Sequence, residues 1–396
     1  MKLGSLFDGI GGWPLAATRY DIVPVWASEI EAFPIEVTKI RFPNMKHLGD
    51  ITKINGAEIE PVDVITLGSP CQDLSIAGNR NGMQIICPVC GWVYEYRSIQ
   101  EAESCPLCCA EPEQTRSNLF HEGMRIIGEM REATNGEYPR FAVWENVPGA
   151  FSSNKGADFR AVLEEVTEAQ IPIPRSGRWA SAGVVRGNGV EVAWRVLDAR
   201  YWGVPQRRKR IFLVADFAGQ CAAKILFKPE SLRRNTAESG SPREGTAGGF
   251  EDSVGTTGRL MFSCAGYSNY QLGELAATQR AAMAKQTDVD LVVAFHTVAA
   301  IDCRSLYESE ELSGTLQAKS GGGYSLNYQN PVRIDYAVRR LTPLECERLQ
   351  GFPDGWTDIP GASDTARYKA LGNGMAQPCP DYIMQGIAEV LYDFLY

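Results

Sequence analysis

The sequence predicts an α/β protein with a doubly wound, mostly parallel sheet and a second, smaller and irregular β-rich domain. Three observations support this. The first 215 or so residues alternate short apolar strands with amphipathic helices. After about residue 216 the chain turns to short β-like pieces rich in Gly, Ser, Thr and Asn. A chain of 396 residues with 44% from the hydrophobic set is long enough for two domains of ordinary globular composition.

The elements of the first domain, over residues 1–215, follow from their periodicity. Apolar runs predict strands at residues 2–7, 22–26, 62–67, 140–144, 190–196 and 210–215. Apolar residues at helical spacing predict helices at residues 33–41, 118–131 and 158–169. Strands that alternate with helices imply a parallel sheet covered on both faces.

The rest of the chain is expected to form a middle domain and a returning segment. The middle domain should span residues 216–360, and two of its segments, 273–278 and 310–315, are either a weak internal duplication or a recurring turn. Residues 361–396 should return to the first domain. Their last part carries apolar residues at the spacing of one helix face, which predicts a terminal helix over residues 382–396.

Charge and hydropathy restrict the location and the partners. The net charge of -9 argues against a partner held by a general positive field. Residues 195–210 are the exception, with six Arg or Lys against one acid. No apolar run reaches the ~18 residues of a membrane helix, and Asp8 interrupts any leader-like start. We therefore expect a cytoplasmic protein without a membrane partner.

The first motif that carries chemistry is Ser-Leu-Phe-Asp-Gly-Ile-Gly-Gly at residues 5–12, a strand that enters a glycine-rich turn before a helix. Glycines let the backbone approach a ligand closely, and a helix N-terminus offers unpaired N–H groups. The pattern is not G-x-G-x-x-G, and Asp8 inside the turn would disfavour a pyrophosphate and suit a cationic ligand. A tight strand-to-helix turn without a ligand explains the motif equally well.

Two acids follow the next expected strands. Glu29 comes after the strand at residues 22–26 and is placed to accept from ribose hydroxyls. Asp50 could accept from an adenine amino group, with Ile30 and Ile51 packing against the ring. The alternative for each acid is a surface position or a helix cap.

A cysteine and a carboxylate end two further strands. Cys71 lies in Gly-Ser-Pro-Cys-Gln at residues 68–72, directly after an apolar strand, where a nucleophile would lie. A lone cysteine is otherwise more often a small buried hydrophobe. Glu145 ends the strand at residues 140–144 and should reach the same edge of the sheet. A thiol and a carboxylate on neighbouring strand ends form a site for nucleophilic addition.

Together these motifs resemble the ordered motif set of the DNA cytosine-5 methyltransferases of bacterial or bacteriophage type. The matching segments are residues 7–12, 68–72, 145–147, 206–210, 340–346 with 350–353, and 372–374. The resemblance covers residues 1–215 and 335–396, and it implies the Rossmann-like fold of S-adenosylmethionine-dependent methyltransferases. The middle of the chain takes the place of the family's variable target-recognition domain.

The resemblance implies a reaction and the residues that carry it. Cys71 would add to C6 of a cytosine flipped out of duplex DNA, and Glu145 would hydrogen-bond N3. Arg208 and Arg210 match the family arginines near the base, Arg210 at cytosine O2; the alternative for both is phosphate contact or a solvated face. The S-adenosylmethionine site would comprise Phe7, Asp8, Gly9, Gly11, Gly12, Glu29, Ile30, Asp50, Ile51, Pro70, Leu119 and Asn373.

An insert at residues 85–112 departs from the family pattern. It contains Cys87, Cys90, Cys105 and Cys108 in a C-x2-C-x14-C-x2-C spacing, which predicts a zinc-ribbon-like tetrathiolate site for structural Zn²⁺. The alternative is four unrelated thiols in a reducing cytosol. Residues 83–114 carry five acids and one Arg, so we expect the insert to support the loop over the target base and not to clamp phosphates.

Three other functions are compatible with parts of the sequence. An RNA cytosine methyltransferase shares the motifs, although a sizeable middle domain favours duplex DNA. A catalytically silent DNA-binding protein does not need Cys71 and Glu145, and a nicotinamide enzyme fails on the glycine pattern. The expected protein is a monomer, and any cognate restriction endonuclease would be a separate chain.

Overall fold

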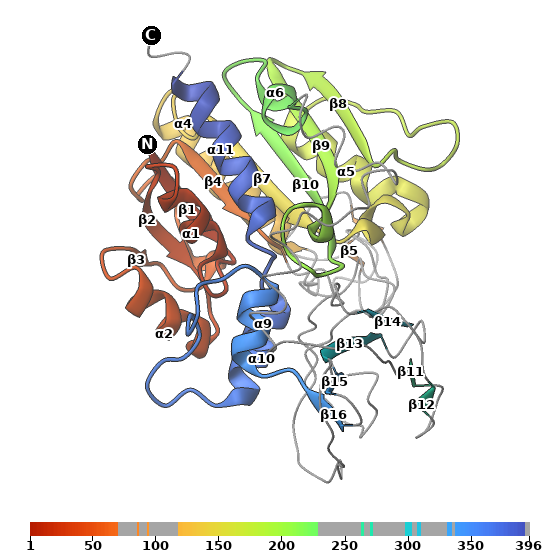
Figure 1. Ribbon diagram of the computed structural model, residues 1–396. Coiled ribbons are helices and arrows are strands. Elements are labelled where there is room, and N and C mark those ends of the chain that lie inside the picture. The colour runs from red at the N-terminus through yellow and green to blue at the C-terminus, as the bar shows by residue number, and fades with distance from the viewer. Residues whose placement is uncertain are drawn as a thin grey trace.

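The computed structural model describes residues 1–69, 118–228 and 341–392, together with short paired strands between these ranges, and its centre is a sheet of eight strands (Figure 1). The spatial order is β3-β2-β1-β4-β7-β10-β9-β8. The strands are β1 (Lys2–Leu6), β2 (Val23–Ser28), β3 (Lys46–His47), β4 (Val64–Leu67), β7 (Phe141–Asn146), β8 (Ala182–Gly187), β9 (Val190–Asp198) and β10 (Lys209–Asp216).

The first five strands of that spatial order are parallel, and the last three continue the sheet with antiparallel pairs. The expected doubly wound, mostly parallel sheet is therefore present. The chain reverses its direction of winding at β1, because β2 lies on one side of it and β4 on the other. In α/β proteins, ligands bind at such a switch point, outside the carboxyl ends of the strands, which here are those of β1 and β4.

Helices cover both faces because alternate strand residues point to opposite sides. Val64, Phe141 and Phe212 belong to a core shared with α1, α6 and α11, whereas Ile65 and Trp144 belong to a core shared with α4 and α5. The bounds are α1 (Gly12–Thr18), α2 (Ala32–Arg41), α4 (Asn118–Ala133), α5 (Ala157–Thr167), α6 (Ala222–Leu226) and α11 (Pro378–Tyr392).

Short 3-10 turns link several of these elements at the ends of strands. They are η1 (Ile51–Lys53), η2 (Pro148–Phe151), η3 (Ser153–Gly156) and η4 (Ala199–Tyr201). Within the described ranges no helix is both long enough and apolar enough to span a bilayer.

The C-terminal part returns to the start of the chain, as the sequence predicts. In Figure 1, α11 lies along α1, and Ile383 and Ile387 share a core with Trp13. A third apolar cluster joins Ile10 and Val37 to α9 (Pro343–Leu349) and α10 (Asp364–Asn373). These contacts tie residues 341–360, which we expected in the middle domain, to the α/β core; the separation of a middle domain remains a prediction.

The intervening ranges are described only as paired strands. A hairpin of β5 (Ile85–Ile86) and β6 (Val93–Tyr94) precedes α4. A second hairpin comprises β11 (Ser263–Cys264) and β12 (Tyr270–Gln271). A four-stranded antiparallel sheet comprises β13 (Val298–Asp302), β14 (Tyr307–Ser309), β15 (Pro331–Ile334) and β16 (Ala337–Arg340). The strand content agrees with the β-rich texture of that part of the sequence.

Candidate active site

Four parallel strands end side by side at one edge of the sheet, and each has, at or just after its end, a residue that the sequence singles out. Phe7 and Asp8 follow β1, Glu29 follows β2, and Gly68 follows β4. Glu145 lies one residue before the end of β7. We call this edge the carboxyl edge. The strand order therefore places the predicted cofactor and reaction residues together.

The glycine-rich turn holds its shape through backbone contacts. Phe7, Gly9 and Gly11 all have positive φ, of 57°, 57° and 79°. The Asp8 N–H donates to Ser28 O of β2 at 3.1 Å, which fixes the turn against the neighbouring strand. A Cβ on Gly12 would lie 2.9 Å from Gln377 Nε2, so the returning C-terminal segment packs directly on the turn.

Asp8 is buried at the base of this turn, with 5% of its surface exposed. Its Oδ1 accepts from Ser5 Oγ at 2.6 Å, whereas Oδ2 has no hydrogen-bond partner among the described residues. Burial raises the pKa of this carboxyl to about 8, the Glu29 charge adds to the rise, and the Ser5 hydrogen bond opposes it. A cationic ligand in the turn would favour the ionised form, which fits a sulfonium compound.

Glu29 fixes the opposite side of the turn. Its Oε2 accepts from Gly9 N at 2.9 Å, and its Oε1 accepts from Ile30 N at 2.7 Å and Glu31 N at 2.9 Å. The carboxylate therefore links the turn to the start of α2. Ile30 is 73% exposed beside it, an unusual exposure for a large apolar side chain that would suit a ring packed on it.

Asp50 and Ile51 both have structural roles. Asp50 is a helix cap, which was the alternative to adenine binding, and Ile51 is a core residue, which the sequence did not suggest. Asp50 caps η1, with Oδ1 accepting from Thr52 N at 3.1 Å and from Thr52 Oγ1 at 2.9 Å. These hydrogen bonds lower the pKa of the Asp50 carboxyl. Ile51 is 4% exposed and belongs to the core between α4 and the sheet. Their contact with adenine remains a prediction.

Glu145 and Arg210 form an ion pair at the carboxyl edge. Arg210 Nε lies 2.8 Å from Glu145 Oε1, and the two side chains are 18% and 15% exposed. The antiparallel register of β7 and β10 explains the pairing, because Phe212 lies opposite Glu145 and Ile211 opposite Asn146. A Cβ on Gly68 would lie 3.7 Å from Glu145 Oε2, so the pair lies against the end of β4.

Ser69, two residues before the predicted nucleophile, is held by hydrogen bonds from side chains of the neighbouring strand β7. Ser69 is buried, and its Oγ accepts from Trp144 Nε1 at 3.0 Å and from Asn146 Nδ2 at 3.5 Å. Cys71 and Pro70 lie outside the described residues, as do Cys87, Cys90, Cys105 and Cys108. The described ranges contain no group of three or more His, Cys, Asp or Glu side chains that could hold a metal.

The remaining predicted residues surround the same edge. Arg208 is 3% exposed and its Nη2 donates to Gly372 O at 3.3 Å, which ties β10 to the turn that carries Asn373. Asn373 is exposed at the end of α10, and a Cβ on the following Gly374 would lie 3.6 Å from Ile10 Cδ1. Leu119 is half-buried in the first turn of α4.

One contact of the cofactor turn was missed by sequence reasoning. Trp356 Nε1 donates to Ile10 O at 2.8 Å, and Arg41 Nε donates to Trp356 O at 3.0 Å. These residues are 346 and 315 positions apart, and no local pattern joins them. The neighbouring motif at 350–353 marks the segment, but only the fold shows that its tryptophan supports the turn.

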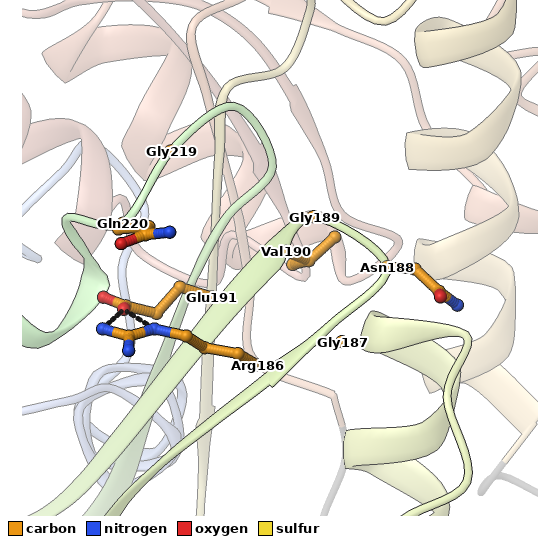
Figure 2. A pocket seen from close by; sticks show the side chains of 8 residues that line it. All are labelled: Arg186, Gly187, Asn188, Gly189, Val190, Glu191, Gly219 and Gln220. Carbon is orange, nitrogen blue, oxygen red and sulfur yellow. Dashed lines mark hydrogen bonds and ion pairs between the residues drawn. The ribbon is translucent and has the colours of Figure 1, made fainter.

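A hollow of about 300 Å³ lies at the other end of the sheet, beside the β8–β9 hairpin (Figure 2). In Figure 2, Arg186 reaches across to Glu191, with Nε 2.6 Å from Oε2. Glu191 is fully buried, and its Oε1 accepts from Ala223 N at 3.0 Å. These groups satisfy one another, and the hollow lies away from the predicted chemistry.

Comparison with known proteins identifies relatives over nearly the whole chain. A protein named DNA N-6-adenine-methyltransferase, from Escherichia phage P1, is 30% identical over an alignment that covers 98% of this chain and 61% of that protein. Type II methyltransferase M1.ScrFI from Lactococcus lactis subsp. cremoris is 27% identical, with 98% of this chain and 78% of that protein covered. The chain thus spans less than two thirds of the phage P1 relative.

Solved structures share the fold. A putative DNA modification methyltransferase encoded within an Escherichia coli prophage gives a TM-score of 0.53 at 16% identity, with 99% of each chain covered. The S. pombe Dnmt2 methyltransferase gives 0.53 at 15%, with 100% of each chain covered. The family model for C-5 cytosine-specific DNA methylase matches residues 1–86 and 110–389. This match covers most of the sequence, and the chain belongs to the C-5 cytosine-specific DNA methylase family.

Proposed function

We propose that this protein transfers a methyl group from S-adenosylmethionine to C5 of a cytosine in a specific duplex DNA sequence, through a covalent bond between Cys71 and C6. The Glu145–Arg210 pair carries this proposal, because it lies against the end of β4, and Cys71 is the fourth residue after that strand in the sequence. A carboxyl and a guanidinium at that position match the N3 and O2 edge of a cytosine ring.

The roles of the residues follow from the electronics of the ring. Cytosine C5 is a poor nucleophile until a thiolate adds at C6, so the Cys71 thiolate forms the C6–S bond first. A proton held between Glu145 and N3 neutralises the charge that develops on the ring, and Arg210 holds O2. After methylation, loss of the C5 proton and departure of Cys71 restore the aromatic ring. S-adenosylmethionine supplies the electrophilic methyl group.

The residues of the glycine-rich turn fit a cationic nucleoside. Asp8 offers a buried carboxyl oxygen without a partner among the described residues. Glu29 stands at the end of β2, the usual position of an acid that accepts from ribose hydroxyls, and Ile30 presents an exposed apolar face beside it. Phe7, Leu119 and Asn373 would complete the pocket.

Cytosine is preferred over adenine as the target, although the phage P1 relative is named for adenine. That relative extends well beyond the region shared with this chain, so its name need not describe the shared part. The family model is specific to C-5 cytosine methylases, and a thiol positioned for addition has a role in cytosine chemistry.

A transfer assay separates the alternatives. Labelled S-adenosylmethionine is incubated with duplex DNA or transfer RNA, and the product nucleosides are identified. We expect 5-methylcytosine in DNA and none with Cys71→Ala; Cys221→Ala, a buried cysteine at the far end of β10, is the matched control. Label in N6-methyladenine or in transfer RNA alone would replace the proposal, and no label in either would indicate a silent binding protein.

The partners and the location follow from this function as proposals. The enzyme acts on double-stranded DNA as a cytoplasmic monomer, and the strands of residues 263–340 belong to its target-recognition domain. A restriction endonuclease of the same system would act separately. Bisulfite sequencing of DNA from expressing cells would give the modified base and its sequence context together.

The cysteine insert is proposed to bind structural Zn²⁺. The described strands of this insert are antiparallel, and in the sequence β5 ends directly before Cys87 and β6 begins three residues after Cys90. The family match omits residues 87–109, which include all four cysteines. Four thiolates at this spacing suit a tetrahedral zinc site.

Elemental analysis of the purified protein tests the zinc proposal. We expect about one zinc per chain, lost in Cys87→Ser/Cys90→Ser and kept in Cys221→Ser. Chelator-stripped protein should lose turnover on DNA while it still binds S-adenosylmethionine. Absence of zinc, or full turnover after its removal, would refute the site or its role.

A further inference from the structure

Two segments at the carboxyl edge meet through one tryptophan. Trp179, which precedes β8, donates from Nε1 to the carbonyl of Gly156, at the start of α5, at 2.8 Å. Its ring also packs edge-on against Phe159 and Trp194, with centroid distances of 5.3 and 6.0 Å. The segment before β8 is thereby fixed to the turn that follows β7.

The turn after β7 has a strained backbone. Asn154, Lys155 and Gly156 are consecutive left-handed residues, with φ of 46°, 56° and 88°. This conformation costs roughly 1–2 kcal/mol for a residue with a side chain. The bond from Trp179 and a bond from Asn154 Nδ2 to Asp158 Oδ1 at 2.9 Å help to hold it. Lys155 is exposed on this turn, and the two hydrogen bonds hold its backbone in one conformation.

The segment before β8 presents two more cations. Gly177 N donates to Pro174 O at 2.8 Å and closes a turn between Arg175 and Arg178, and both arginines are exposed. Trp194 Nε1 donates to Ala180 O at 3.0 Å and anchors the end of the segment. Lys155, Arg175 and Arg178 have no ion pair within the described residues.

These three cations, which we call the basic lip, lie at the same edge of the sheet as the proposed reaction, on the side of β8. β8 starts at the end of β9 that neighbours the start of β10, so the lip shares the edge of the sheet with Glu145 and Arg210. Residues 148–157 and 170–181 contain no acid; of the acids next to them in the sequence, Asp158 is buried and Glu168, at the far end of α5, is exposed. In a chain of net charge -9 this is a local positive surface.

We propose that the basic lip binds backbone phosphates of duplex DNA beside the cytosine that enters the site. The inference rests on the proposed function and extends it to the part of the protein that holds the duplex. Exposed cations without an ion pair among the described residues, on a backbone held beside the proposed reaction site, suit phosphates, which position a duplex without reading its sequence. Opposite charge and location together favour DNA over an acidic protein as the occupant.

The salt dependence of binding tests the lip without knowledge of the target sequence. A labelled duplex of mixed sequence is titrated with Arg175→Gln/Arg178→Gln over a range of salt concentrations. Each phosphate contact removed should reduce the slope of log K against log salt by about 1, so we expect a reduction of about 2. Lys2→Gln/Lys224→Gln, which removes two exposed cations at the opposite edge, is the matched control and should leave the slope unchanged.

A second variant tests the anchor. Trp179→Phe keeps an aromatic ring but removes the N–H that holds Gly156, so duplex binding should weaken while affinity for S-adenosylmethionine stays the same. A wild-type enzyme that methylates DNA, together with lip variants of unchanged slope, would overturn the lip and leave the proposed function standing. A wild-type protein that neither binds nor methylates duplex would overturn both. An equal loss of slope in the Lys2/Lys224 control would show that only the total charge of the protein matters, and it would also overturn the lip.

Discussion

The two ends of the central sheet are built differently. At the carboxyl edge, Asp8 carries a buried oxygen without a partner among the described residues, and Ile30 is 73% exposed. At the amino edge, charged groups are satisfied: Lys2 Nζ lies 2.8 Å from Glu60 Oε1, and Arg186 neutralises buried Glu191.

This difference indicates that the carboxyl edge serves function and the amino edge serves stability. Unsatisfied and strained groups cost free energy, and they persist where a ligand or a reaction uses them. Groups that satisfy one another mainly support the fold. Substitutions at the carboxyl edge should therefore reduce activity without unfolding the protein, and substitutions at the amino edge should do the reverse.

The largest expected effect is that of Glu145→Gln. The amide keeps the shape of the side chain but cannot exchange a proton with N3, so kcat should fall by about 10²- to 10⁴-fold. Affinity for S-adenosylmethionine should change little, and loss of the ion pair with Arg210 should lower the melting temperature by only a few degrees. Glu60→Gln, which removes a carboxylate of the amino edge, is the control and should keep full kcat. Comparable losses of kcat in the two variants would contradict the division of roles between the two edges.

A smaller effect is expected for Asp8→Asn and depends on pH. Because a sulfonium ligand favours the ionised carboxyl, wild-type affinity for S-adenosylmethionine should rise with pH up to about 8 and then level off. The Asn variant should bind more weakly and without this dependence. Calorimetry in two buffers of different ionisation enthalpy should detect proton release by the wild type only.

The same carboxyl affects stability with the opposite sign. Its pKa is raised in the folded state, so the stability that the protonated form contributes is complete below about pH 4. That stability is lost at about 1.4 kcal/mol per unit as the pH rises toward 8. Asp8→Asn should flatten this decline in thermal melts. An unchanged pH dependence of both melting and binding would show that Asp8 does not titrate in this range.

The smallest effect is expected at the amino edge. Arg186→Gln leaves the buried Glu191 carboxylate with only the Ala223 N–H, although the exposure of Arg186 limits the loss to about 1–2 kcal/mol. The melting temperature should fall by a few degrees while kcat per folded molecule stays constant. A selective loss of kcat would show that the hollow beside this hairpin takes part in function.

The sequence predicts most of the sheet because its strands are apolar on both faces. The observed β1, β2, β4, β7, β9 and β10 overlap the expected strands, with ends that differ by a few residues. β8 was missed because it is an edge strand in which Val184 is exposed, and it follows a segment rich in Pro and Gly. The sequence predicts a helix after the glycine-rich turn but not the bounds of α1, because Gly12 and Pro14 weaken its helical pattern.

The residues of the candidate site that lie at strand ends could be predicted from the sequence. Glu29 and Glu145 could be assigned from their positions after apolar runs, and the structure brings both to the carboxyl edge. The pairing of Arg210 with Glu145 depends on the antiparallel register of β10, which periodicity does not reveal. The bond from Trp356 to Ile10 likewise depends on the return of the chain.

The most direct test of the central claim is covalent capture of the target base. A duplex that contains 5-fluorocytosine cannot lose its C5 substituent as a proton, so the sulfur attached at C6 should remain bound once the methyl group is transferred. With S-adenosylmethionine present, we expect a stable protein–DNA adduct whose digestion leaves the modified nucleotide on the peptide that contains Cys71. Methylation of ordinary duplex without any adduct, or an adduct on another cysteine, would contradict the account.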